Sequence, residues 1–185
     1  MPPTEQTAQA FEILVIDDEP DIRELLAEHL RTRGYRVAVA GDGLAAVSLI
    51  NRSNGQFGLI LTDLQLPGTD GLSVLQAARA ASSSTQVVII TGYASLDSAI
   101  KAVRLGAYDY LTKPFSLGQI DVLLDRVKER LALEAENRSL LRRLDTRDAE
   151  TAHSAQDRLG GIEARLAAIE VSLRELVSDL SRRRP

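Results

Sequence analysis

The chain has 185 residues, of which 44% are hydrophobic, and a formal net charge of −4. These values favour one folded domain with an extension and argue against wholesale disorder. The absence of cysteine excludes disulfides, cysteine nucleophiles and thiolate metal sites. The segment MPPTEQTAQA lacks the apolar core of a signal peptide, and no apolar run reaches the roughly 20 residues that span a bilayer. We therefore expect a cytoplasmic protein with no membrane partner, and a disordered lead over residues 1–10.

Short apolar runs rich in Val and Ile alternate with amphipathic segments in the first two thirds of the chain. The runs predict buried strands over residues 12–17, 35–40, 58–63, 86–91 and 107–112. The amphipathic segments predict helices over residues 21–34, 43–53, 71–80 and 95–106. Strict alternation of strands and helices indicates an α/β fold, doubly wound, with a parallel sheet, helices on both faces and right-handed crossovers.

The pattern becomes purely helical after Pro114. A first helical segment covers residues 117–144, and its apolar positions change register after Leu131, which indicates either a coiled-coil discontinuity or a change of the packed face. Residues 145–157 are polar and predict either exposed helix or a flexible joint.

A heptad seam follows in residues 158–183, which predict a coiled-coil helix. Its apolar positions are Leu159, Ile162, Leu166, Ile169, Leu173, Leu176 and Leu180. Because charged residues flank this narrow seam on both sides, we favour self-association or a partner helix over packing back onto the same domain.

Polar side chains follow the predicted strands at their carboxyl ends, where open α/β sheets bind ligands. They are Asp17, Asp18 and Glu19 after the first strand, Asp63 after the third, Thr91 after the fourth, and Thr112 and Lys113 after the fifth. One acidic residue at a strand end is often only a helix cap, but the whole set is not explained in that way. Carboxylates without imidazole or thiolate suit a hard cation, and Mg²⁺ is the one that keeps waters and binds phosphate.

The motifs IDDEP, LTDLQLPGTDG, ITGYAS and YLTKPF, in this order, resemble the receiver domain of two-component response regulators. The resemblance covers about residues 11–127, and GYASLDSAIKAVRLGAYDYLTKPF is most similar to the receivers of nitrogen-regulator-type activators. It implies a flavodoxin-like sheet of five strands in the order 2-1-3-4-5.

The resemblance also implies the chemistry of the site. Asp63 matches the aspartate that accepts a phosphoryl group from a phosphohistidine of a sensor histidine kinase or phosphotransfer protein. Asp18 and Asp63, with the backbone carbonyl of Gln65, are expected to hold Mg²⁺, and Asp17 to act mainly through a metal-bound water. Lys113 is expected to pair with a phosphoryl oxygen.

Thr91 and Tyr110 match the switch pair of the family. Thr91 is expected to move toward the new phosphoryl oxygen, and Tyr110 to turn into the space left behind. The result is a population shift of the face formed by residues 95–106, residues 107–112 and the helix that begins at residue 117.

Other positions carry weaker expectations. The peptide before Pro114 is expected to be cis, as in the family. Gln65 and Tyr93 depart from the commonest residues; the first is suited to positioning a hydrolytic water and the second to shielding the phosphoryl group. His29 and His153 have no metal or triad partner in the sequence, and we interpret both as incidental.

The leading functional hypothesis is a phosphorylation-controlled interaction protein, not an ordinary enzyme, whose coiled coil carries oligomerisation or partner docking. No G-x-x-x-x-G-K motif follows the receiver-like region in this sequence. One alternative is a phosphate sink or relay without a conformational output. Another is a DNA-binding regulator that acts through the coil and its Arg182–Arg184 tail, although the extension has balanced charges and nucleic acid is not an expected partner.

Overall fold

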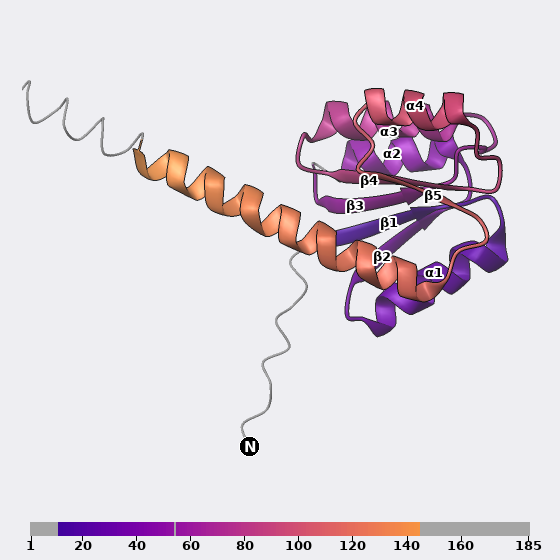
Figure 1. Ribbon diagram of the computed structural model, residues 1–185, viewed down its shortest axis with the longest axis horizontal. Helices are drawn as coiled ribbons and strands as arrows, with labels where there is room; N and C mark the ends of the chain where they lie inside the picture. The colour runs from indigo at the N-terminus through magenta and orange to yellow at the C-terminus, as the bar shows by residue number, and fades with distance from the viewer. Residues whose placement is uncertain (1–10, 54, 145–185) are drawn as a thin grey trace, which may run out of the picture. The chain divides into compact units, whose positions relative to one another are not determined.

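The computed structural model describes residues 11–53 and 55–144 of the chain (Figure 1). The predictions for residues 1–10, the polar segment 145–157, His153 and the heptad seam within 158–183 lie outside the described residues. The chain divides into two compact units, Met1–Glu134 and Ala135–Pro185. In the second unit the described residues, 135–144, are helical. A search of the described helices for a span that could cross a membrane finds none.

The first unit contains one parallel sheet. Its strands are β1 (Glu12–Ile16), β2 (Arg36–Ala40), β3 (Phe57–Thr62), β4 (Gln86–Thr91) and β5 (Asp109–Thr112). They lie in the order β2-β1-β3-β4-β5, and every neighbouring pair is parallel. This order confirms the predicted fold class. The chain reverses its direction of travel across the sheet between β1 and β3, which places a crevice beyond the carboxyl ends of these two strands.

The helices are α1 (Pro20–Thr32), α2 (Gly43–Arg52), α3 (Gly71–Ala81) and α4 (Leu96–Arg104). A further helix begins at residue 117 and continues through residue 144, and we call it the C-terminal helix. Local sequence determines where three of these helices begin. The side chains of Asp42, Asp70 and Ser95 cap α2, α3 and α4 by accepting hydrogen bonds from backbone N–H groups of the first turn.

The helices form a layer on each face of the sheet (Figure 1). On one face, Leu26 and Leu30 of α1 share a buried core with Leu124 and Val127 of the C-terminal helix. On the other face, α2 and α3 bury a second core against β1, β3 and β4. The apolar positions that begin the C-terminal helix therefore pack within the domain. Leu133, Leu140, Leu141 and Leu144, after the register change, are exposed.

Candidate functional site

The carboxyl ends of β1 and β3 carry two buried aspartates. Asp63 is 5% exposed and Asp17 is 2% exposed. The backbone N–H of Asp63 donates to the carbonyl of Ile16 at 2.9 Å, and that of Asp17 donates to the carbonyl of Ala40 at 3.2 Å. Hydrogen bonding of the sheet thus continues one residue past each strand. It holds the two carboxylates at adjacent positions of the rim, where the sequence predicted them.

The loop after Asp63 packs closely around that residue. The Asp63 carboxylate accepts a hydrogen bond from the backbone N–H of Gln65 at 3.1 Å. Gly71 opens α3 directly beneath, and a Cβ at this position would lie 2.1 Å from the Asp63 carbonyl oxygen. Glycine is required here because any side chain would push the backbone of the aspartate aside.

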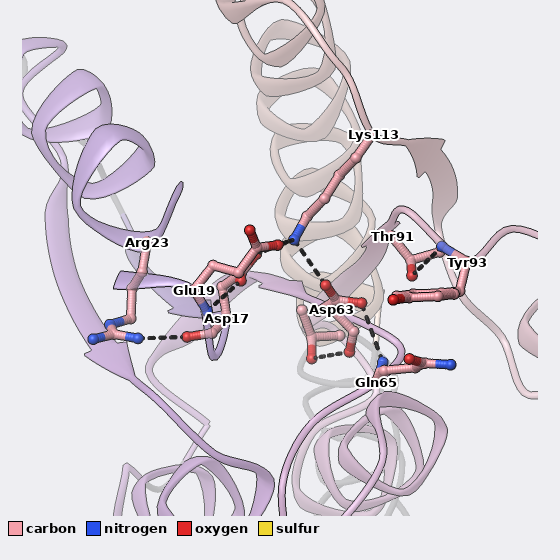
Figure 2. Close-up of polar contacts among 9 residues, drawn as sticks. Asp17, Glu19, Arg23, Asp63, Gln65, Thr91, Tyr93 and Lys113 are labelled. Atoms are coloured by element: carbon pink, nitrogen blue, oxygen red, sulfur yellow. Dashed lines mark hydrogen bonds and ion pairs between the residues drawn. The ribbon is translucent and has the colours of Figure 1, made fainter. Parts of the chain in front are cut away.

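Lys113 reaches into the site from the end of β5 and pairs with three carboxylates (Figure 2). Its Nζ lies 2.8 Å from Asp17 Oδ2, 2.9 Å from Glu19 Oε1 and 2.8 Å from Asp63 Oδ2. Burial by itself would lower the pKa of the Lys113 ammonium, but the hydrogen bonds to the three carboxylates outweigh burial and raise its pKa above the ordinary value. Lys113 is therefore a permanent positive charge in the site.

The environment of Asp17 acts in the opposite direction. Burial raises the pKa of its carboxyl, and the hydrogen bonds from Lys113 and from the backbone N–H of Glu19 offset only part of that rise. Arg23 of α1 donates to the Asp17 carbonyl at 2.6 Å and orients the turn from the backbone side. The site therefore contains a carboxylate that is poorly stabilised as an anion and is suited to receive a second cation.

The donor set fits a divalent metal ion. Asp17, Asp18 and Asp63 each offer a carboxylate oxygen, and these atoms lie within 4.8 Å of one another. Asp18 is exposed, whereas the other two are buried. Oxygen ligands with one side open to solvent suit Mg²⁺, which keeps several of its waters. The peptide of Gln65 lies beside the cluster, since its N–H bonds Asp63, but its carbonyl as a ligand remains a prediction.

The predicted switch residues lie on neighbouring strands. Thr91 ends β4 with no exposed surface, and its hydroxyl accepts a hydrogen bond from the backbone N–H of Tyr93 at 3.2 Å. Tyr93 is 70% exposed, and Figure 2 shows its ring directed toward Asp63. Tyr110 lies one strand farther out, and its hydroxyl pairs with Ser98 Oγ of α4 at 2.9 Å. The Lys113–Pro114 peptide is cis, as expected.

The structure also shows contacts that the sequence analysis missed. Glu19 lies at the N-cap of α1 and also contacts Lys113. His29 has a partner that the sequence did not identify, because its Nε2 lies 2.8 Å from Asp121 Oδ1 on the C-terminal helix. Arg33, one turn after His29, binds the other oxygen of Asp121. The i, i+4 spacing of His29 in α1 and Arg33 at its C-cap was visible in the sequence, but nothing in it identified a partner 92 positions from His29.

Comparisons with known proteins identify the family of this chain. The family model of the response regulator receiver domain matches residues 13–125. The transcriptional activator protein PfeR of Pseudomonas aeruginosa is 38% identical over 135 residues, which are 73% of this chain and 43% of PfeR. The nitrogen assimilation regulatory protein NtrX of Azorhizobium caulinodans is also 38% identical, and the match covers 71% of this chain and 29% of NtrX. The chain thus spans less than half the length of these relatives.

Solved structures agree as well. A response regulator receiver domain protein from Clostridium thermocellum has a TM-score of 0.63 and 28% identity, with 66% of this chain and 98% of that chain covered.

Proposed function

Since the receiver-domain family model matches more than half of the chain, this protein belongs to the response regulator receiver domain family, and on that premise we propose that Asp63 accepts a phosphoryl group. The single observation that carries the proposal is the position of Asp63. Its buried carboxylate contacts the Lys113 ammonium and lies in one cluster with the carboxylates of Asp17 and Asp18. This arrangement brings a nucleophile, a fixed cation and metal ligands together at the switch point of the sheet.

The proposed donor is the phosphohistidine of a sensor histidine kinase or phosphotransfer protein. A carboxylate oxygen of Asp63 forms a bond to phosphorus as the bond from phosphorus to the imidazole nitrogen breaks. The products are an acyl phosphate on Asp63 and an imidazole whose released nitrogen takes up a proton from solvent. Beyond this self-phosphorylation, and possible self-catalysed hydrolysis of its product, we propose no enzymatic activity.

Each neighbouring residue has a proposed role in this transfer. Asp18 and Asp63 are the direct ligands of Mg²⁺ together with the Gln65 carbonyl, and Asp17 acts mainly through a bound water. When bound, the metal supplies positive charge that stabilises the charge developing on the transferred group. Lys113 contributes a point charge to a phosphoryl oxygen. Its Nζ lies 2.8 Å from Asp63 Oδ2, the position from which it can reach a phosphoryl group on that carboxylate.

We further propose that phosphorylation shifts the face formed by α4, β5 and the start of the C-terminal helix. In the present state Tyr110 is bonded to Ser98 in the first turn of α4, so an inward turn of Tyr110 releases that helix from β5. The helix carries an apolar stripe that is exposed: Leu96 is 76%, Ile100 41% and Val103 68% exposed. A change in the position of this stripe is a suitable output, because exposed apolar patches mark interaction surfaces.

The oligomerisation or partner docking of the heptad segment, residues 158–183, completes the proposal and rests on its sequence pattern alone. Light scattering of the protein, with and without a phosphoryl mimic, tests whether mass or partner binding responds to phosphorylation. An unchanged mass and unchanged binding with rapid phosphoryl turnover would instead support a sink or relay. A salt-dependent shift of DNA would support the DNA-binding alternative.

Incubation with a small phosphodonor and Mg²⁺, followed by intact-mass spectrometry, tests the acceptor. The wild-type protein should gain one phosphoryl group, and Asp63→Asn should gain none. Asp70→Asn is the matched control, because it removes a carboxylate from the same loop while asparagine still caps α3. Phosphorylation of Asp63→Asn to the wild-type level would contradict the proposal.

A further inference from the structure

Glu19 contacts the lysine of the site although it lies outside the acidic cluster. Its Oε1 lies 2.9 Å from Lys113 Nζ, and its side chain is 58% exposed. Asp17 and Asp63, which share the same ammonium, have side chains only 3% and 7% exposed. The metal-fitting cluster contains Asp17, Asp18 and Asp63. Among the described partners of Lys113, Glu19 is thus the one that a cation bound to the cluster would not engage.

Lys113 and a divalent cation compete for the same carboxylates. An ammonium group has three protons to donate, and those of Lys113 point to three carboxylates in this structure (Figure 2). A cation held directly by Asp63 and through a water by Asp17 would displace the ammonium from Asp63 and weaken its contact with Asp17. A buried charge that loses its partners is costly, so the displaced ammonium would oppose entry of the cation unless another carboxylate received it.

The main chain of Glu19 is held at the edge of the acidic cluster. Glu19 is the N-cap residue of α1 and has an extended backbone, and Pro20 follows it in the first turn. Its N–H donates to Asp17 Oδ1 at 3.0 Å, so the residue is tied to the cluster through the main chain while its side chain extends to the rim. An ammonium that moves outward, away from a second cation, moves toward this carboxylate.

We propose that Glu19 is a positioning residue that retains Lys113 when the acidic cluster takes up a divalent cation. Retention lowers the cost of cation entry and keeps the ammonium within reach of a phosphoryl group on Asp63. The second consequence rests on the proposed phosphoacceptor function, whereas the first rests on the geometry of the cluster. Loss of Glu19 affects the metal-loaded state most, because Lys113 still has two carboxylate partners in the metal-free state.

Calorimetric titration of the full chain with Mg²⁺ tests the inference with three variants. Glu19→Gln removes the charge but keeps an amide oxygen that can accept a hydrogen bond from Lys113. Glu19→Asp keeps the charge but shortens the side chain, so it separates contact from charge. Asp21→Asn removes a carboxylate from the same turn of α1, where the structure shows no ion pair with Lys113. We expect both Glu19 variants to bind Mg²⁺ roughly fivefold more weakly, from the usual strength of a partly exposed charged hydrogen bond, and Asp21→Asn to stay within about twofold of wild type.

The ammonium signal of Lys113 gives a second measurement that does not depend on activity. Lys101, Lys113 and Lys128 are the three lysines of the sequence, so ¹⁵N-lysine labelling gives few signals to assign. At saturating Mg²⁺, the Lys113 signal should persist in the wild type and broaden through solvent exchange in both Glu19 variants.

Wild-type affinity in Glu19→Asp, equal weakening in Asp21→Asn, or a wild-type protein that does not bind Mg²⁺ would each overturn the inference. Failure of Asp63 to accept phosphate would overturn the proposed function, while the calorimetry would still decide the role of Glu19 in cation entry.

Discussion

Replacing Lys113 with methionine removes the one cation that the described site shares among three carboxylates. The Lys113 side chain is 11% exposed, and those of Asp17 and Asp63 are 3% and 7% exposed. Removal of one partner from a buried ion pair typically costs about 3–5 kcal/mol of stability. We therefore expect Lys113→Met to destabilise the metal-free protein strongly at neutral pH.

Protonation of a carboxyl group sets an upper limit to this loss. Asp17 has an ordinary pKa of 3.8, and each pH unit above that value costs about 1.4 kcal/mol to protonate the group. One carboxyl can thus be neutralised at about pH 7 for about 4 kcal/mol, and at about pH 5 for about 1.6 kcal/mol. The expected loss is therefore about 3–4 kcal/mol at about pH 7, and it shrinks below about 2 kcal/mol at about pH 5.

Urea unfolding followed by circular dichroism, with a chelator present, measures the loss. Lys128→Met is the matched control, because Lys128 is an exposed lysine on the C-terminal helix. Mg²⁺ should restore much of the stability of Lys113→Met, since a ligand at about 100 times its dissociation constant contributes about 2.7 kcal/mol. The reasoning is refuted if Lys113→Met is as stable as Lys128→Met in chelator, or if its loss is the same at both pH values.

Three further predictions concern other parts of the domain. Burial raises the pKa of Tyr35 above its ordinary 10.0, so above about pH 10 the unfolded chain loses this proton first and the free energy of unfolding falls as pH rises. Tyr35→Phe should reduce that fall in urea titrations, and the same dependence of stability on pH in both proteins would contradict the prediction. Gly71→Ala should cost at least about 2 kcal/mol in thermal unfolding and slow phosphorylation of Asp63, because its Cβ would clash with backbone; wild-type stability would show that the loop can yield. Ser98→Ala removes the partner of the Tyr110 hydroxyl. The Tyr110 ring signals in NMR should then shift toward their positions in the phosphorylated protein, because loss of this hydrogen bond changes the conformational equilibrium by about 1 kcal/mol. Signals at the wild-type position would exclude a role of Ser98 in holding Tyr110 in its present position.

The parallel α/β class and most of the element boundaries could be predicted from the residue pattern, whereas the sheet order was implied by the resemblance of the motifs to receiver domains. Val-rich and Ile-rich runs identify strands that are buried on both faces, and their alternation with amphipathic segments leaves few possible topologies. The helix starts were predicted from apolar spacing, and the structure adds that Asp70 and Ser95 cap α3 and α4 by accepting backbone hydrogen bonds. These features are local, so the pattern along the chain contains them.

The residues of the site could be predicted from the sequence, but the contacts between their side chains could not. The positions of Asp17, Asp63 and Lys113 after their strands placed them on one rim, because parallel strands end at the same edge of a sheet. That Lys113 contacts both aspartates and Glu19 depends on how far its side chain extends and on which atoms surround it.

The sequence by itself determined the fold class and the acidic rim, because periodicity and strand ends are properties of neighbouring residues, and its motifs identified the candidate acceptor through their resemblance to receiver domains. Tertiary structure alone decided the long-range pairs, such as His29 with Asp121 and Tyr110 with Ser98. It also decided that Leu124 and Val127 serve the domain core, although their spacing equally suits a coiled coil. The physical reason is that an apolar or charged side chain specifies what kind of partner it needs, whereas only the packed chain determines which residue supplies it.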